Sequence, residues 1–163
     1  MMATEKRVSL EINGRRHEAS VSSNETLLDL LRTLGHVDVK CGCEKADCGA
    51  CAVLVDGEAV DSCITLAAAA DGRRVTTVTG LGTPDAPHPL QAAFIEHGAT
   101  QCGYCIPGMI VAAKALLDRH PDPTDAEMRF ALSGNLCRCT GYTRIFSAIR
   151  EAAGALKSKG ARP

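Results

Sequence analysis

Cysteine residues carry the most distinctive chemistry in this sequence. Eight of the nine cysteines form two groups of four: one spaced C-x4-C-x2-C with a fourth after eleven further residues, the other C-x2-C and C-x-C across 31 residues. Cysteine thiolates bind iron–sulfur clusters and structural zinc, so each group could hold a metal centre. Cys41 is left over. The first cysteine set is Cys43, Cys48, Cys51 and Cys63, and the second cysteine set is Cys102, Cys105, Cys137 and Cys139.

The spacing of the first cysteine set indicates a 2Fe–2S cluster. C-x4-C-x2-C with a distant fourth cysteine is the spacing of plant-type ferredoxins, whereas structural zinc sites usually carry two C-x2-4-C pairs. Small residues such as Gly49 and Ala50 lie between the ligands. They let backbone N–H groups approach sulfur, and such hydrogen bonds help to set the reduction potential.

The second cysteine set is less specific when taken alone. A C-x2-C pair with a second close pair is also typical of zinc sites. Cys105 precedes Pro107, which suits the first position of a helix. The positive end of a helix dipole stabilises a thiolate on either metal, so the spacing leaves iron and zinc open.

Composition narrows the classes of protein and partner. The chain has 163 residues, 45% of them hydrophobic but only 3% aromatic, which gives two half-length domains thin cores that metal sites would help to stabilise. The net charge is −1 and no basic run exceeds two residues, which argues against a nucleic-acid partner. There is no apolar signal core and no stretch of ~20 apolar residues, so we expect a cytoplasmic chain with no membrane insertion. A reducing compartment and an odd number of cysteines argue against a disulfide framework.

The first half of the chain predicts a small sheet crossed by one helix. Alternating apolar residues around Asn13-Gly14 indicate a hairpin, and Asp56-Gly57 marks a second one after residues 52–55. Ser22 and Glu25 form a capping-box pattern ahead of a helix that starts at residue 26. With a further strand over 74–78, the expected arrangement is a β-grasp domain over residues 6–79.

The second half predicts a helical domain. Residues 80–89 combine glycine and proline and are interpreted as a linker. Helices are expected over 90–97, 107–120, 124–132 and 143–157, the third with a capping box between Thr124 and Glu127. The predicted fold class is therefore α+β: an N-terminal β-grasp domain followed by a C-terminal four-helix domain over 90–157, with both cysteine sets in loops or at helix starts.

Three ordered motifs resemble the iron–sulfur subunit of the xanthine oxidase family of molybdenum hydroxylases. They are CGAC at 48–51, QCGYCIPGM at 101–109 and LSGNLCRCTGY at 132–142, and the resemblance extends over residues 6–155. It implies a plant-type ferredoxin domain and a four-helix domain, each binding one 2Fe–2S cluster through its cysteine set. It also implies an electron-transfer subunit of an oxidoreductase complex, with no substrate site in this chain.

The resemblance further implies the neighbours of each cluster. The helical-domain cluster would lie beside the molybdopterin cofactor of a large subunit, with Gln101 in contact with the pterin and Cys139 close to it. The ferredoxin-domain cluster would pass single electrons to FAD on a medium subunit or to another acceptor. The implied assembly is a hetero-oligomer such as a dimer of heterotrimers.

The sequence departs from the family pattern at a few positions, and it leaves two alternative functions open. Ala46 stands where the family usually has glycine, so a positive φ there would strain the loop, and Ile106 stands where threonine is frequent. Cys41 is interpreted as a free thiol, or as a replacement for Cys43. A free-standing two-cluster ferredoxin and a zinc-stabilised interaction module are the alternative functions. The five histidines show no C-x-H pair and are expected to be surface or structural residues.

Overall fold

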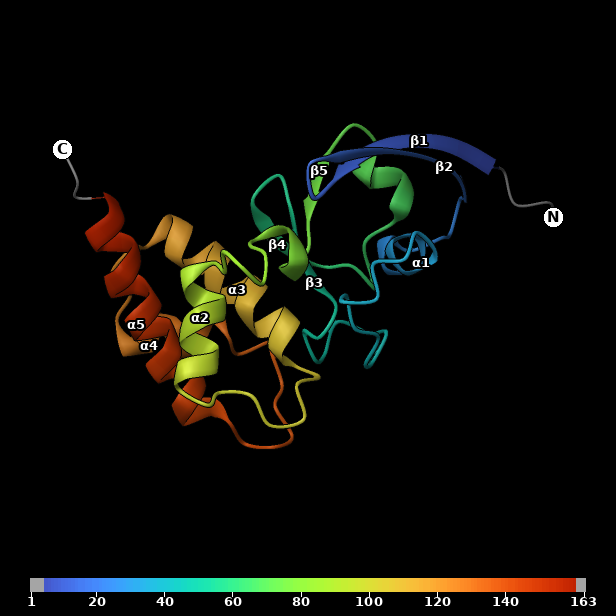
Figure 1. Cartoon of the computed structure of the whole chain (residues 1–163). Coiled ribbons are helices and arrows are strands. Elements are labelled where there is room, and N and C mark those ends of the chain that lie inside the picture. Colours follow the sequence, from blue (N-terminus) through green and yellow to red (C-terminus); the bar gives the residue numbers. More distant parts are fainter. Residues whose placement is uncertain (1–4, 161–163) are drawn as a thin grey trace.

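The N-terminal part of the protein is a mixed sheet. The computed structural model describes the backbone of residues 5–160 and the side chains of residues 5–158. The strands are β1 (Glu5–Ile12), β2 (Arg15–Ser22), β3 (Ala52–Val55), β4 (Glu58–Asp61) and β5 (Arg74–Thr76). They lie in the order β2-β1-β5-β3-β4, with β1 and β5 parallel and the other neighbours antiparallel. The sheet forms one end of the molecule and the helices the other (Figure 1).

Both predicted hairpins are confirmed. A two-residue type I′ turn needs positive φ at both central positions. Asn13 and Gly14 have φ values of +50° and +78°, and Asp56 and Gly57 have +51° and +92°. These turns fix the register, with Ile12 opposite Arg15 in the first hairpin.

The last strand is shorter than predicted. The expected strand over 74–78 ends at Thr76, and a 3₁₀ turn over Val78–Gly80 follows. The Asn13 side chain accepts a hydrogen bond from the backbone N–H of Thr77 at 2.9 Å, so this N–H does not bond to a neighbouring strand. The first hairpin turn thus ends β5.

The crossing helix α1 (Leu27–Thr33) begins later than its predicted cap. The proposed capping box of Ser22 and Glu25 is wrong: Thr26 caps the helix and accepts the Asp29 N–H at 3.1 Å. Ser22 and Glu25 instead close the preceding turn, where Glu25 accepts the Ser22 N–H at 3.1 Å. The helix start is fixed by a tertiary contact, because the Leu27 N–H donates to the Thr65 carbonyl.

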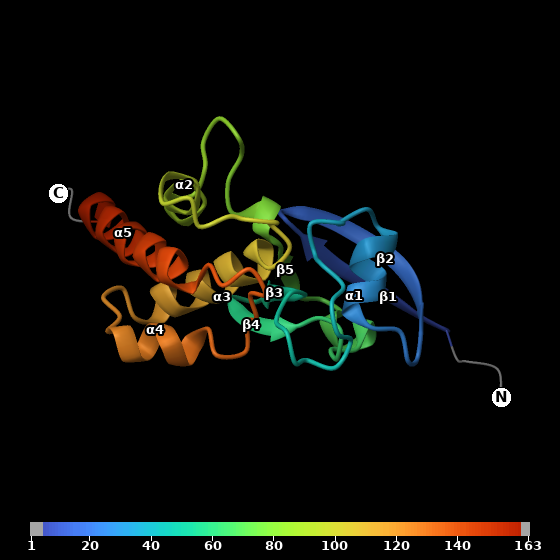
Figure 2. The same ribbon diagram turned by 90° about the horizontal axis from the view of Figure 1, so that it is seen from below.

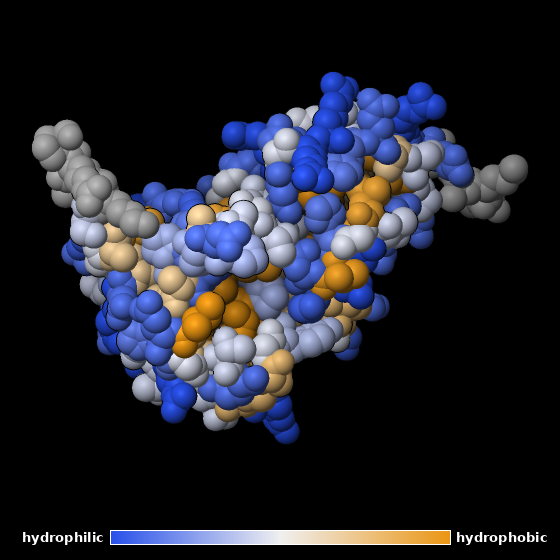
Figure 3. Space-filling model, in the orientation of Figure 1, coloured by the Kyte–Doolittle hydropathy of each residue, from blue (hydrophilic) through white to orange (hydrophobic). Residues whose placement is uncertain are grey.

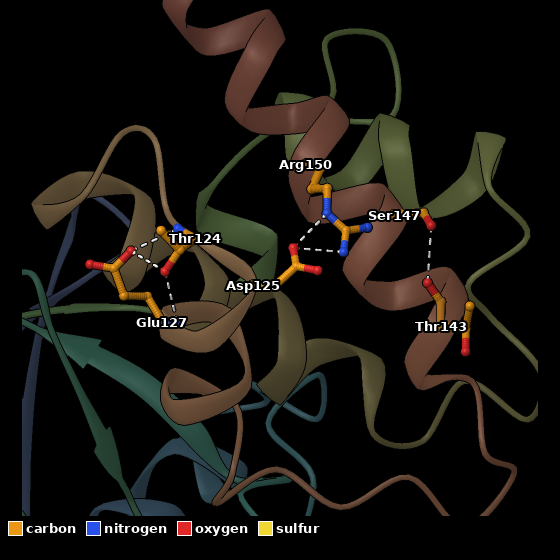
Figure 4. Close-up of polar contacts among 6 residues, drawn as sticks. All are labelled: Thr124, Asp125, Glu127, Thr143, Ser147 and Arg150. Atoms are coloured by element: carbon orange, nitrogen blue, oxygen red, sulfur yellow. Dashed lines mark hydrogen bonds and ion pairs between the residues drawn. The ribbon is translucent and has the colours of Figure 1, made fainter.

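The four predicted helices are confirmed, with ends that shift by a few residues. Thr124 accepts the Glu127 N–H at 3.3 Å and Glu127 accepts the Thr124 N–H at 2.7 Å, so the predicted capping box is present (Figure 4). Asp125 pairs with Arg150, which ties the third of these helices to the last. They are α2 (Pro89–Glu96), α3 (Ile106–Arg119), α4 (Asp125–Ala131) and α5 (Tyr142–Gly160).

Each part has its own hydrophobic core, and α3 joins the two. One core lies between the sheet and α1, and the other lies among the four later helices. A small third cluster of Leu54, Val111 and Ala115 packs α3 against β3. Figure 2 shows α3 lying beside β3 and β4, between the two parts. The loops that carry the two cysteine sets are thereby held together.

The visible surface is mainly hydrophilic. Figure 3 shows apolar side chains in separate patches over the helical part and over the sheet part. The most exposed large apolar side chains are Phe130 and Ile95, which are 83% and 75% exposed. Within the described residues, no helix combines the length and the apolarity needed to cross a bilayer.

Candidate metal centres

The first cysteine loop folds so that backbone amides point at sulfur. It runs between α1 and β3, and its φ is positive at Glu44, Ala46 and Gly49. The N–H groups of Lys45 and Asp47 lie 3.4 Å and 3.3 Å from the Cys43 sulfur. The Lys45 N–H, followed by the Cys48 thiol, lowers the pKa of the Cys43 thiol to about 7. These amides therefore favour the thiolate of Cys43, the form that binds metal.

Ala46 adopts the conformation for which glycine is suited. Its φ is +62°, so the expected strain is present, and a left-handed alanine costs on the order of 1 kcal/mol. The loop keeps its turn at this position without glycine. The neighbouring Asp47 N–H still reaches the Cys43 sulfur.

The sulfurs of the first set meet in two pairs. The Cys43 and Cys48 thiols are near enough to shift each other's pKa, as are those of Cys51 and Cys63. Cys51 and Cys63 are buried, and burial raises the pKa of Cys51 to about 12. Ser62 anchors this pair, because its hydroxyl donates to the Cys51 carbonyl at 2.7 Å.

The second set shows the same pairwise arrangement. The Cys139 thiol lowers the pKa of Cys102 and the Cys137 thiol raises that of Cys105, so the thiols of each pair are near neighbours. Cys105 immediately precedes α3, and burial raises its pKa to about 12. The Cys137 sulfur accepts the Gly141 N–H at 3.4 Å. Each half of this set is therefore a pair of sulfurs from two separate loops.

Tyr142 holds the loop that leads into Cys137. Its hydroxyl accepts the Cys137 N–H at 2.7 Å and lies 3.4 Å from the Asn135 carbonyl. Neither Tyr142 nor Asn135 was predicted as a site residue. Both lie within the motif at 132–142, so the resemblance marks the segment without assigning these roles.

Two pairs of thiols per set fit a 2Fe–2S cluster. In such a cluster four cysteines are shared between two irons, two on each. A zinc ion instead gathers its four ligands around one centre. Among the described side chains, no three cysteine, histidine or carboxylate groups gather as one metal ion requires. The donor set of each loop therefore suits a two-iron cluster, whose metal would deprotonate the buried thiol of Cys51 and the half-buried thiol of Cys105.

The two sets face a common pocket and differ in exposure. A pocket of about 450 Å³ is lined by Cys43 and Cys48 from the first set and by Cys102, Cys105 and Cys137 from the second, among others. Cys102 and Cys139 are exposed, whereas Cys137 is buried. Three members of the second set thus face the first set across this pocket, and Cys102 and Cys139 also open to the surface.

The predicted pterin contact, Gln101, lies at this exposed edge. Its side chain is exposed and sits against Gly141, where an added Cβ would lie 2.6 Å from the Gln101 Oε1. Gly141 follows Thr140, which has a φ of +60° and is next to Cys139. The structure thus places Gln101 beside the loop of Cys139.

The ninth cysteine has a different partner. The Cys41 thiol bonds to a Glu44 carboxylate oxygen at 3.0 Å, and this bond is the largest cause of its raised pKa. Its carbonyl accepts a hydrogen bond from Tyr104, which links the two cysteine loops. Among the histidines, His97 bonds to Glu151 at 2.8 Å, which joins α2 to α5.

Comparison with known proteins agrees with this arrangement. A 2Fe–2S iron-sulfur cluster binding domain matches residues 10–77, and a [2Fe-2S] binding domain matches residues 77–150. The small FeS subunit of nicotinate dehydrogenase from Eubacterium barkeri is 49% identical over 146 residues, covering 89% of this chain and 93% of the relative. The iron-sulfur-binding subunit of aldehyde oxidoreductase from Escherichia coli K12 is 42% identical over 167 residues, covering 93% and 73%.

A solved structure shows the same fold. The crystal structure of quinoline 2-oxidoreductase from Pseudomonas putida 86 contains a chain that superposes with a TM-score of 0.89 at 40% identity, covering 98% of this chain and 99% of that one. Both cluster-binding domains, both relatives and this fold agree with the motifs. The chain belongs to the iron–sulfur, electron-transfer small subunits of the xanthine oxidase family of molybdenum hydroxylases.

Proposed function

We propose that each cysteine set holds one 2Fe–2S cluster, with each pair of sulfurs on one iron. The pairs are Cys43 with Cys48, Cys51 with Cys63, Cys102 with Cys139, and Cys105 with Cys137. The pairwise approach of the thiols supports this assignment. When bound, such a cluster takes up and releases one electron at a time. We divide the chain accordingly into a ferredoxin domain at 6–79, a linker at 80–89 and a helical domain at 90–157.

The opposite exposure of the two halves of the second set carries the proposed direction of electron flow. Cys102 and Cys139 open to the surface, while Cys137 is buried and Cys105 is half-buried. We place the molybdopterin cofactor of a large subunit against the exposed pair. Gln101 lies at the same edge, and its amide can both donate to and accept from a pterin ring. Electrons would enter there and leave through the first set.

The remaining partners follow from this direction. A group at the surface of the ferredoxin domain must take the electrons away, and we propose FAD on a medium subunit or another acceptor in that place. Exposed thiolate ligands need cover from solvent, which a subunit interface provides. We therefore propose a hetero-oligomer such as a dimer of heterotrimers. The large subunit would supply the substrate site, as the family resemblance implies.

Replacing Gln101 by alanine in the purified complex tests the placement of the cofactor. We expect the iron content and both cluster spectra to remain near wild type. Reduction of the clusters by substrate should slow, or molybdenum should be retained less well. A buried amide contact that is lost from a polar ring costs about 1–3 kcal/mol, so the rate or the retention should change measurably.

Cys48→Ser is the matched control for this experiment. It should preserve reduction of the molybdenum centre by substrate while blocking the exit of electrons to the external acceptor. If Gln101→Ala leaves the wild-type rate of cluster reduction and a full complement of molybdenum, the pterin is not beside Gln101. A chain that purifies alone and exchanges electrons with soluble enzymes would instead indicate a free-standing two-cluster ferredoxin.

A further inference from the structure

The loop before Cys137 reaches across to the first cysteine loop. The Asn135 side-chain amide donates to the Gly49 carbonyl at 3.0 Å, and the Leu136 N–H donates to the Cys48 carbonyl at 3.0 Å. Asn135 is only 7% exposed, although it is polar. Burying the Asn135 amide without a hydrogen-bond partner would be costly, so the bond to the Gly49 carbonyl stabilises this arrangement of the two loops.

The Gly49 peptide has little freedom in this contact. Gly49 has a φ of +65°, and an added Cβ would lie 2.4 Å from the Asn135 Nδ2 and 2.6 Å from the Gly134 carbonyl. From the other side, a Cβ added to Gly108 on α3 would lie 2.1 Å from the Gly49 carbonyl. The helical part therefore encloses the Gly49 peptide on two sides.

This peptide lies between two proposed cluster ligands, Cys48 and Cys51. The Ala50 N–H belongs to the same planar peptide unit as the Gly49 carbonyl. The Gly49 carbonyl also accepts the Ala52 N–H at 3.2 Å, so two donors fix its direction. Because Gly49 and Ala50 are adjacent, the direction of this carbonyl determines where the Ala50 N–H points.

We propose that Asn135, from the helical domain, is a positioning residue for the cluster of the ferredoxin domain. Its amide holds the Gly49 carbonyl and thereby aims the Ala50 N–H at the Cys48 sulfur. Hydrogen bonds to the sulfurs tune the potential of an iron–sulfur cluster. A donor stabilises the added negative charge of the reduced cluster, so this contact raises the potential of the first cluster. The inference rests on the proposed ligand role of Cys48.

Asn135→Ala in the iron-loaded complex removes the amide and leaves the backbone contact of Leu136. We expect the midpoint potential of the first cluster to become more negative, while that of the second cluster stays within titration error of wild type. Hydrogen exchange at the Leu136 amide should accelerate about tenfold, because loss of the neighbouring bond is worth about 1.4 kcal/mol.

Two further variants separate positioning from general stability. Ser133 lies two residues before Asn135, and its hydroxyl donates to the Phe130 carbonyl at 2.8 Å within the helical domain. Ser133→Ala removes this bond, so both potentials and the exchange rate should stay at wild type. Asn135→Gln keeps an amide donor and should restore part of the lost potential. If Asn135→Ala loses the first cluster altogether, recovery of its iron in Asn135→Gln supports the proposal, and equal loss in both variants overturns it.

An unchanged potential of the first cluster in Asn135→Ala, with its iron in place, overturns the inference and leaves the proposed function intact. A lower melting temperature with unchanged potentials does the same, because it shows a purely structural role. Failure of the proposed function looks different. The wild-type chain itself would then lack iron and labile sulfide.

Discussion

Replacing Ala46 by glycine should stabilise the protein, because Ala46 holds a left-handed conformation that alanine disfavours. Ala46 has a φ of +62° between Cys43 and Cys48. This conformation costs a non-glycine residue about 1–2 kcal/mol. Glycine also gives the unfolded chain more conformational freedom, which offsets about 0.4–1 kcal/mol of the strain energy removed. With the middle of each range, the net gain in the free energy of unfolding is about 0.8 kcal/mol.

Thermal unfolding of the iron-loaded chain measures this gain. For a chain of this length, the melting temperature should rise by about 1–4 °C. Ala126→Gly is the matched control, because Ala126 is exposed within α4 and carries no such strain. Glycine there should cost about 1 kcal/mol and lower the melting temperature. A decrease for Ala46→Gly that equals the decrease for Ala126→Gly would refute the assigned loop conformation.

Two other substitutions test the ligands and the helix caps. Cys43→Ser should abolish or severely distort the EPR signal of the first cluster. Cys41→Ser should leave both signals unchanged, because the Cys41 thiol bonds to Glu44. Loss of a signal on changing Cys41 would mean that the loop uses different ligands. Thr124→Ala removes the cap of α4 and should lower the free energy of unfolding by about 1 kcal/mol, measured by denaturant titration. An unchanged midpoint would show that the cap in Figure 4 contributes nothing.

Local signals in the sequence were sufficient for most elements. Asn13-Gly14 and Asp56-Gly57 determine their hairpins through backbone φ, and the capping box of Thr124 and Glu127 marks the start of α4. The start of α1 was wrong because two capping patterns overlap, and a tertiary bond from Leu27 to the Thr65 carbonyl selects the second. Local patterns carry no information about such a distant partner.

The pairing of the sulfurs could not be derived from spacing. It depends on loops in which non-glycine residues such as Glu44, Ala46 and Thr140 adopt positive φ, which residue type does not reveal. The contact of Asn135 with Gly49 joins residues that lie 86 positions apart. The family resemblance identified the segments that hold these residues, but their contacts became visible only with the fold.

The metal content of the purified chain tests the central claim most directly. Eight ligand cysteines in two sites predict about four irons and about four acid-labile sulfides per chain. Elemental analysis combined with a sulfide assay measures both on one sample. About four of each would support two 2Fe–2S clusters, and stoichiometric zinc without labile sulfide would contradict the account.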